Sequence, residues 1–459
     1  MDNQGFSIFG STQIFGQNQA ELKPATPLST SLGNFSYPLT TKSLFRSSNT
    51  DISELPLESS SNISPLAINA SGPFIFNQQR PLSIPIGVAT DPGGNVFVTS
   101  DNVVNTLITK FDPNGNALGQ IPLGNITSIS SIGKLALEPT SGQILDLFPD
   151  GTLISINPSN GAITPLFNVK SLPIDISAIY DVAAGRVDNF GGLIQPQFAS
   201  YGDLAIFNGG SFLDLYISGI SQAQTFPFVM RLRFVQGTLA DADVLVSSRA
   251  SAAPQDSSPP GVAVNSQGIV LTTLPIPNAT ATGNYNTPVA LPVDLDLQQL
   301  TGSFLPRVVL NRVDISSRGM TTDAAGNFYI ATSAIGTTLG GSRGSGATVI
   351  LSPNLNSVLG VLTLGQGIFR TEDVAVTPSG NRVYITVRSP ESAVVTFALT
   401  NTNTQSFSSQ GFSQEVRGSS QASRLWVDYP TSDPMAFLSP TPTNYEYPYL
   451  NFETNLEDA

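Results

Sequence analysis

The sequence contains no histidine and no cysteine in its 459 residues. Without an imidazole there is no histidine-containing catalytic triad, no histidine metal ligand and no histidine acid or base near neutral pH. Without a thiol there is no disulfide, no iron–sulfur cluster and no cysteine nucleophile. Because no other catalytic constellation stands out, these absences predict a protein that is not an enzyme.

Charge is also scarce. Charged residues make up 12% of the chain, against roughly 25% in an average soluble domain. The 33 acidic residues outnumber the 20 basic ones, and the formal net charge is −13. No run of basic residues occurs, which excludes nucleic acid as a partner, because binding to phosphate needs clustered Lys and Arg. The apolar fraction of 40% is large enough for a sizeable core.

The sequence lacks the usual targeting segments. Residues 1–20 have neither the positive start nor the apolar stretch of a conventional signal peptide. No stretch reaches about 18 consecutive apolar residues, so a membrane span is not expected. Only five of the basic residues are lysine, and Ser, Thr, Asn and Gln are abundant. This composition is typical of a bacterial exoprotein and predicts an extracellular or cell-surface location, reached without a conventional N-terminal signal peptide.

What is present is a repeat of short β-strands. An apolar strand, a turn rich in Gly, Asn and Asp, and a second strand recur along the chain, most clearly in residues 86–99, 260–272, 318–330 and 372–385. Two weaker copies lie at 134–147 and 203–217. The residue before the first apolar strand position marks each copy, at Gly87, Lys134, Asp203, Gly261, Gly319 and Asp373. The markers are 47 to 69 residues apart. Six small antiparallel units at this spacing predict an all-β, six-bladed β-propeller.

The first copy carries a family resemblance. It reads P-x-G-V-A-x-D-x-x-G-N-x-x-V from Pro85 and continues into a strand that ends in Lys110-Phe111-Asp112 and Gly115. This string resembles the NHL-repeat family of propellers. The insert 175–200 and the weak second and third copies depart from the pattern. The catalytic members of the family rely on histidine, which this chain lacks.

The chain divides into a propeller and two arms. The propeller is expected over residues 73–400, between an N-terminal arm at 1–72 and a C-terminal arm at 401–459. The arms are polar with spaced aromatics, and segments of this kind can add as strands to a neighbouring subunit or wrap their own propeller. The candidate assembly contacts are Phe6, Phe9, Phe15, Tyr445, Tyr447 and Tyr449.

Calcium is the one cofactor that the residues suggest. Aspartates stand beside turns, at Asp91, Asp112, Asp323 and Asp373, or in D-x-D pairs, at Asp241/Asp243 and Asp294/Asp296. Carboxylates with turn carbonyls can bind Ca²⁺, but Asp and Asn also shape turns through side-chain-to-backbone hydrogen bonds. The ligand density of a calcium loop is absent, so the turn-forming role is favoured and no cofactor is expected.

These features favour a non-enzymatic propeller that serves as a structural or adhesive scaffold. It would assemble with copies of itself, or with other surface proteins or polymers, through its arms into a filament or layer. Two alternatives remain open. One is a propeller that binds an extracellular glycan or peptide at its open face, and the other is a Ca²⁺-dependent hydrolase or lactonase.

Overall fold

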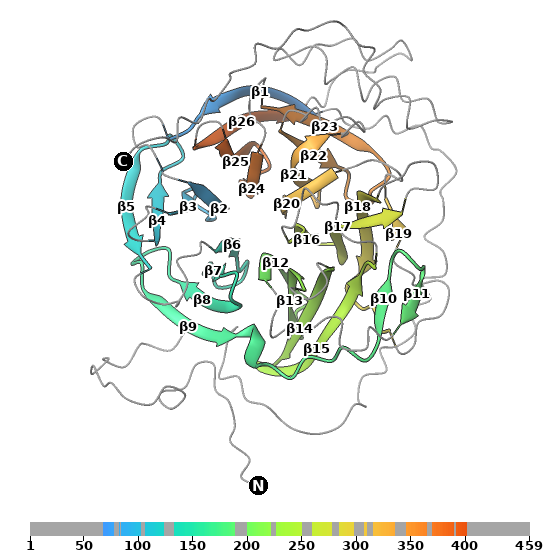
Figure 1. The fold of residues 1–459 in the computed structure, drawn as a ribbon. Helices are drawn as coiled ribbons and strands as arrows, with labels where there is room; N and C mark the ends of the chain where they lie inside the picture. Colours follow the sequence, from blue (N-terminus) through green and yellow to red (C-terminus); the bar gives the residue numbers. More distant parts are fainter. Residues whose placement is uncertain are drawn as a thin grey trace, which may run out of the picture.

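The computed structural model contains six β-sheets arranged as blades around a central axis (Figure 1). The structure describes residues 68–401 apart from 78–81, 83, 102–105, 124–132, 189–199, 222–225, 250–258, 278–283, 298–306, 310–314, 336–345, 365–369 and 390–391. The predicted all-β, six-bladed propeller is therefore confirmed. The six assembly aromatics of the arms lie outside the described residues.

The first two blades each run outward from the axis in chain order. The first consists of β2 (Pro85–Thr90), β3 (Val96–Asp101), β4 (Thr106–Phe111) and β5 (Ala117–Pro122). The second consists of β6 (Lys134–Leu137), β7 (Ile144–Leu147), β8 (Thr152–Ile156) and β9 (Ile163–Asn168), followed by a 3₁₀ turn at Val169–Ser171. The second, weak sequence copy is thus a complete blade.

The third blade is the largest. Its four strands are β12 (Ser200–Asn208), β13 (Phe212–Ile220), β14 (Pro227–Val235) and β15 (Thr238–Ser247). The insert that spaces the second and third copies supplies two more strands, β10 (Ile179–Asp181) and β11 (Arg186–Asp188). β10 pairs in parallel with β15, so the insert extends the outer edge of this blade.

The fourth and fifth blades return to four strands. The fourth consists of β16 (Val262–Val264), β17 (Ile269–Pro277), β18 (Asn284–Pro292) and β19 (Arg307–Val308). The fifth consists of β20 (Ile315–Thr322), β21 (Phe328–Ile335), β22 (Ala347–Leu351) and β23 (Val358–Thr363).

The sixth blade closes the ring with strands from both ends of the described chain. It contains β24 (Arg370–Val376), β25 (Arg382–Ser389) and β26 (Ala393–Asn401), and its outer strand is β1 (Ile68–Ile75). β1 pairs antiparallel with β26. β1 therefore runs across the predicted boundary between the N-terminal arm and the propeller, which lies between residues 72 and 73.

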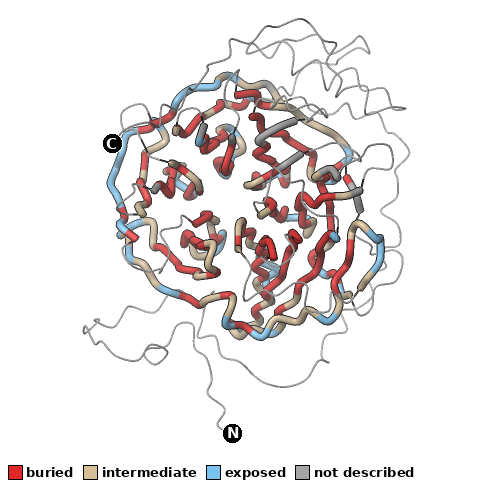
Figure 2. The backbone as a smooth tube through the Cα atoms, viewed as in Figure 1, coloured by how far each residue is buried: buried red, intermediate tan, exposed pale blue. Residues whose placement is uncertain are grey.

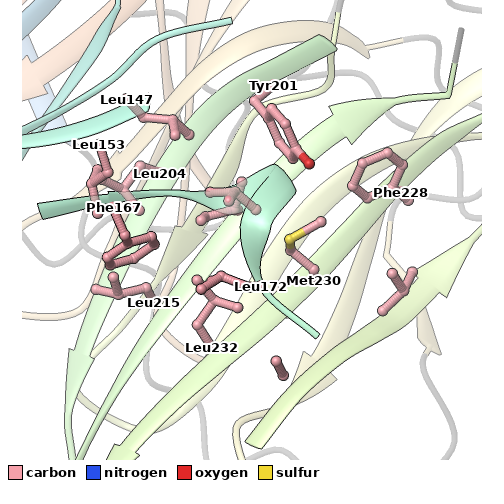
Figure 3. Close-up of a cluster of buried hydrophobic side chains, with 14 of the residues drawn as sticks. Leu147, Leu153, Phe167, Leu172, Tyr201, Leu204, Leu215, Phe228, Met230 and Leu232 are labelled. Carbon is pink, nitrogen blue, oxygen red and sulfur yellow. The ribbon is translucent and has the colours of Figure 1, made fainter. Parts of the chain in front are cut away.

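The core is divided among the contacts between blades. The described residues form six buried apolar clusters, and each lies between two neighbouring blades. Figure 3 shows the cluster between the second and third blades, where Leu153 and Phe167 meet Leu204 and Leu215. Figure 2 shows the same distribution along the backbone, with buried residues inside the ring and exposed residues mainly at its rim. Because each sheet buries both faces against its neighbours, no blade has a core of its own.

Aspartate side chains form the turns after the innermost strands, as the sequence predicts. The carboxylate of Asp91 accepts a hydrogen bond from the backbone N–H of Asn95 at 2.9 Å and another from the Asn95 side chain at 2.7 Å. Asp323 and Asn327 repeat both bonds in the fifth blade. Gly94 and Gly326 take φ values of +80° and +85°, which L-residues with a Cβ adopt rarely. These aspartates therefore shape the turns between the two inner strands.

Candidate functional site

The six marker positions of the repeat meet at the propeller axis. They lie on or directly before the innermost strands of the six blades, β2, β6, β12, β16, β20 and β24, which surround the centre in Figure 1. Three markers are glycine and three are charged, namely Lys134, Asp203 and Asp373. We call these three residues the axial triad. All three are buried, and the two aspartates are each 2% exposed.

Asp203 joins three blades through its carboxylate. One oxygen, Oδ2, accepts hydrogen bonds from the backbone N–H groups of Val262 in the fourth blade, at 2.9 Å, and Met320 in the fifth, at 3.1 Å. The other oxygen accepts from the N–H of Leu204 at 3.0 Å. A side chain of the third blade therefore holds the inner strands of the next two.

Asp373 and Lys134 connect the remaining blades. Asp373 accepts hydrogen bonds from the N–H groups of Val88 in the first blade and of Val374 in its own strand, both at 2.9 Å. The Lys134 ammonium of the second blade lies 3.6 Å from Asp373 Oδ1 and donates to the carbonyl oxygen of Glu372. The axial triad thus bonds the six blades in two sets of three. Asp203 joins the third to fifth blades, and Asp373 with Lys134 joins the sixth, first and second. The expectation that Asp373 stands beside a turn is wrong, because this residue lies within β24 at the axis.

Two of the glycine markers make room for polar side chains at the axis. A Cβ on Gly319 would lie only 2.1 Å from Asp373 Oδ1, and one on Gly261 would lie 2.4 Å from the Ser317 hydroxyl oxygen. Cβ atoms in real proteins do not approach other atoms so closely. The glycine at marker position 319 therefore has a steric cause, contact with the charged marker Asp373, that is visible only at the axis.

Burial raises the pKa values of the two aspartates of the axial triad. Desolvation, together with the negative charge of Asp373, raises the pKa of Asp203 to about 8. Desolvation also raises the pKa of Asp373 to about 6, although Lys134 opposes that shift. Two carboxyl groups share one ammonium group, so protonation of one carboxyl removes the uncompensated negative charge. Carboxyl groups with separated pKa values near neutrality can donate and accept protons.

Two further carboxyl groups lie close to the triad. Asp146 is fully buried on β7, both of its carboxyl oxygens lack a hydrogen-bond partner within the described part of the chain, and burial raises its pKa well above the usual value. A Cβ on Gly133, next to Lys134, would lie 1.7 Å from Asp146 Oδ1. Glu372, next to Asp373, pairs with Arg318 at 3.4 Å. The axis thus gathers ionisable groups from the second, third, fifth and sixth blades.

Most of the aspartates that suggested calcium bond to other groups of the protein. Asp91, Asp112 and Asp323 bond to their own turns. Asp241 and Asp243 lie 3.0 and 3.1 Å from the Arg231 guanidinium, within the third blade. No group of three or more acidic residues arranged to hold a metal occurs in the described ranges. The prediction that the protein needs no cofactor is not tested by these contacts and stays a prediction.

The rim carries a second candidate site. The outer strands β23, β1, β5 and β9 belong to four consecutive blades and contain no charged residue. We call them the uncharged arc. The outer strands of the other two blades, β11 and β19, contain Arg186, Asp188 and Arg307. Among the described residues, the exposed large hydrophobic side chains are Phe74, Ile75 and Leu118, and all three lie on this arc.

Neither the axial triad nor the uncharged arc was predicted from the sequence. Lys134, Asp203 and Asp373 served only as repeat markers, and no contact between them was predicted. A signal was present, because charged residues interrupt apolar strands at the one position that is glycine in the other copies. The uncharged outer strands were also readable, but only once it is known which strand of each blade faces outward.

Comparisons with known proteins concern the fold. No family model and no curated protein matches the chain. A solved streptogramin B lyase is 10% identical, with a TM-score of 0.41 over 73% of this chain and 99% of that one. A Bacteroides thetaiotaomicron protein of unknown function is 12% identical, with a TM-score of 0.43 over 73% and 76%. A protein classed as a candidate gluconolactonase is 14% identical, with a TM-score of 0.42 over 73% and 93%.

These neighbours correct one prediction. The absence of histidine and cysteine predicted a protein that is not an enzyme, but two of the three solved structures bear the names of enzymes. Missing histidine and cysteine do not exclude catalysis, because carboxyl groups with raised pKa values can also serve as acids and bases. At 10 to 14% identity and TM-scores of 0.41 to 0.43, no reaction is transferred from these neighbours to this chain. The resemblance to NHL repeats remains a resemblance.

The described residues contain no helix long and apolar enough to cross a membrane.

Proposed function

We propose that the protein is an extracellular or cell-surface building block whose propeller associates with other copies of the chain. The observation that carries this proposal is the uncharged arc. Edge strands expose unpaired N–H and C=O groups, and proteins commonly block them with charged side chains. Four consecutive outer strands without charge, in a chain of net charge −13, leave one part of the rim open to association.

The arms belong to the same proposal. Residues 3–20 carry no charged side chain and include Phe6, Phe9 and Phe15, and the C-terminal arm places Tyr445, Tyr447 and Tyr449 at alternate positions. Alternating apolar residues suit a segment that adds to a strand edge, since the backbone supplies hydrogen bonds and alternate side chains fill pockets. Neutral glycans or peptides are alternative partners for the same uncharged surface.

The proposal is tested by following the mass of the full chain with concentration. Light scattering and electron microscopy should show oligomers or filaments that grow as the protein is concentrated, and fractionation of the producing cells should place the protein outside them. A full-length variant with Phe6, Phe9 and Phe15 replaced by Ser should associate less if the N-terminal arm contributes. A chain that stays monomeric at every concentration would refute the proposal.

A second function is favoured by the axial triad. Carboxyl groups with pKa values of about 8 and about 6 on the inner strands β12 and β24 suit acid–base hydrolysis of a lactone or ester. The test is a panel of lactones and esters assayed across pH, with and without added Ca²⁺. Hydrolysis by the unaltered protein that is lost in the Asp203→Asn variant would support this function. No hydrolysis by the unaltered protein would rule this function out.

A further inference from the structure

We propose that two copies of the chain meet at β5, with the two β5 strands paired antiparallel around Gln120. This inference rests on the proposed self-association and assigns its contact site. The pairing is isologous, so the same strand contributes from both copies and a two-fold axis passes beside Gln120.

Among the strands of the uncharged arc, β5 has the most accessible edge. Five of its six residues are exposed. β1 and β9 carry prolines inside the strand, Pro73 and Pro165, whereas the proline of β5, Pro122, is its last residue. Each proline removes a backbone donor, and in β5 this loss falls at the end of the strand. β23 is approached by β1, since a Cβ on Gly360 would lie 3.7 Å from the carbonyl oxygen of Ile68. β5 therefore offers the open edge to a second copy.

The hydrogen-bonding pattern of β5 leaves Gln120 facing outward. The N–H of Leu123 donates to the carbonyl of Thr106 on β4 at 3.1 Å. Because antiparallel partners alternate between hydrogen-bonded and non-hydrogen-bonded pairs, the backbone of Ile121 bonds to β4 and the backbone of Gln120, opposite Thr109, does not. The Gln120 side chain donates to the Thr109 hydroxyl at 3.4 Å. The N–H and C=O of Gln120 thus point away from the blade, where they can pair with the same groups of a second copy.

Charge and apolar surface favour a second copy as the partner. Two chains of net charge −13 repel each other, so they approach most easily where neither carries charge. β5 contains no charged residue, and Leu118 on it is 55% exposed. Phe74 and Ile75 lie at the end of the neighbouring β1, whose continuation, Phe76, contacts the turn before β5 at Gly115. Pairing would remove apolar surface from water on both copies.

The chain is well suited to a cross-linking test because it contains no cysteine. In antiparallel pairs, opposite Cα atoms lie about 4.5 to 5.5 Å apart, which suits a disulfide. The full-length Gln120→Cys variant should therefore form a covalent dimer under mild oxidation. Ala240→Cys, which places the thiol at an exposed position on β15, is the control and should stay monomeric under the same conditions.

A second variant tests the backbone bond itself. Gln120→Pro removes the outward N–H and leaves the ladder to β4 intact, so it should weaken association at least tenfold in sedimentation, whereas Gln120→Thr, which keeps the N–H, should not. The contact at β5 would be refuted if the full chain associates, Gln120→Cys forms no covalent dimer and Gln120→Pro associates normally. The proposed function would still stand in that case. If the unaltered chain never associates, the proposed function falls as well.

Discussion

At the scale of single residues, the axial triad determines how the ring is held at its centre. Asp203 and Asp373 accept hydrogen bonds from backbone N–H groups of other blades, and Lys134 supplies the only positive charge of the triad. Hydrogen bonds to charged acceptors are stronger than those between neutral groups. Burial, however, disfavours the ionised form of both carboxyl groups. The balance between these effects makes the triad sensitive to pH and to small changes in volume.

The stability of the fold should fall as pH rises from about 4 to 8. Carboxyl groups of the unfolded chain have pKa values near 4, whereas Asp203 and Asp373 have folded values of about 8 and about 6. Between these values the folded state binds more protons than the unfolded state, so its stabilisation is lost as pH increases. Denaturant titrations of Asp203→Asn should show a flatter pH dependence. Asp112→Asn is the control, because Asp112 is exposed and its pKa is lowered.

The steric role of the glycine markers gives a matched pair of substitutions. Gly319→Ala would place a Cβ 2.1 Å from Asp373 Oδ1, whereas a Cβ on Gly119 meets nothing within 4 Å. We expect Gly319→Ala to destabilise the protein by about 1–3 kcal/mol, as overpacking does. Gly119→Ala should be close to neutral. Equal unfolding midpoints for the two variants would contradict the account of the axis.

At the scale of elements, ring closure depends on β1 and the residues that follow it. β1 pairs with β26, and Phe76 then packs between the first and sixth blades, with ring centroids 5.6 Å from Phe111 and 4.8 Å from Tyr384. Asn77 adds a hydrogen bond from the N–H of Val394 to its side-chain oxygen at 3.0 Å. The N-terminal strand is thus anchored by packing as well as by its ladder.

Two phenylalanines separate packing at the closure from surface effects. Phe76 is 7% exposed and Phe74 is 56% exposed. Phe76→Ala should cost about 3–5 kcal/mol, the usual range for a buried phenylalanine. Phe74→Ala should change the free energy of unfolding by less than about 0.5 kcal/mol. Thermal or denaturant unfolding of both variants measures the difference, and a similar loss for both would mean that Phe76 does not anchor the closure.

At the scale of the whole molecule, charge is distributed unevenly around the ring. The third blade carries arginine–aspartate pairs, such as Arg233 with Asp214 at 2.6 Å, while the outer strands from the fifth blade round to the second carry no charge. A net charge of −13 opposes contact between copies except where charge is absent. The rim therefore has one part suited to association and one that is not.

Association should strengthen as salt is added. Salt screens the repulsion between negative chains over a distance of about 10 Å at 0.1 M, while strand pairing and apolar contact at the uncharged arc do not depend on ion pairs. Sedimentation of the full chain at low and high NaCl measures this effect. Weaker association at high salt would indicate an interface held by ion pairs and would exclude the uncharged arc.

The repeat was readable because its causes are local. Alternating apolar residues form strands, and Gly94 with Asp91 and Asn95 forms a turn within five residues. Four clear copies and two weak ones therefore predicted six blades. The role of residues 175–200 was not predictable in this way, because β10 joins the third blade through a parallel pairing with β15, far along the chain.

The sequence by itself determined the six-bladed fold, the turns and the low charge, since these depend on local conformation and composition. The tertiary structure alone decided which residues become neighbours. It brought Lys134, Asp203 and Asp373 together from positions up to 239 residues apart, and it showed which strand of each blade faces outward. Both candidate sites arise from ring closure, which places equivalent positions of six repeats at one axis and their outer strands on one rim.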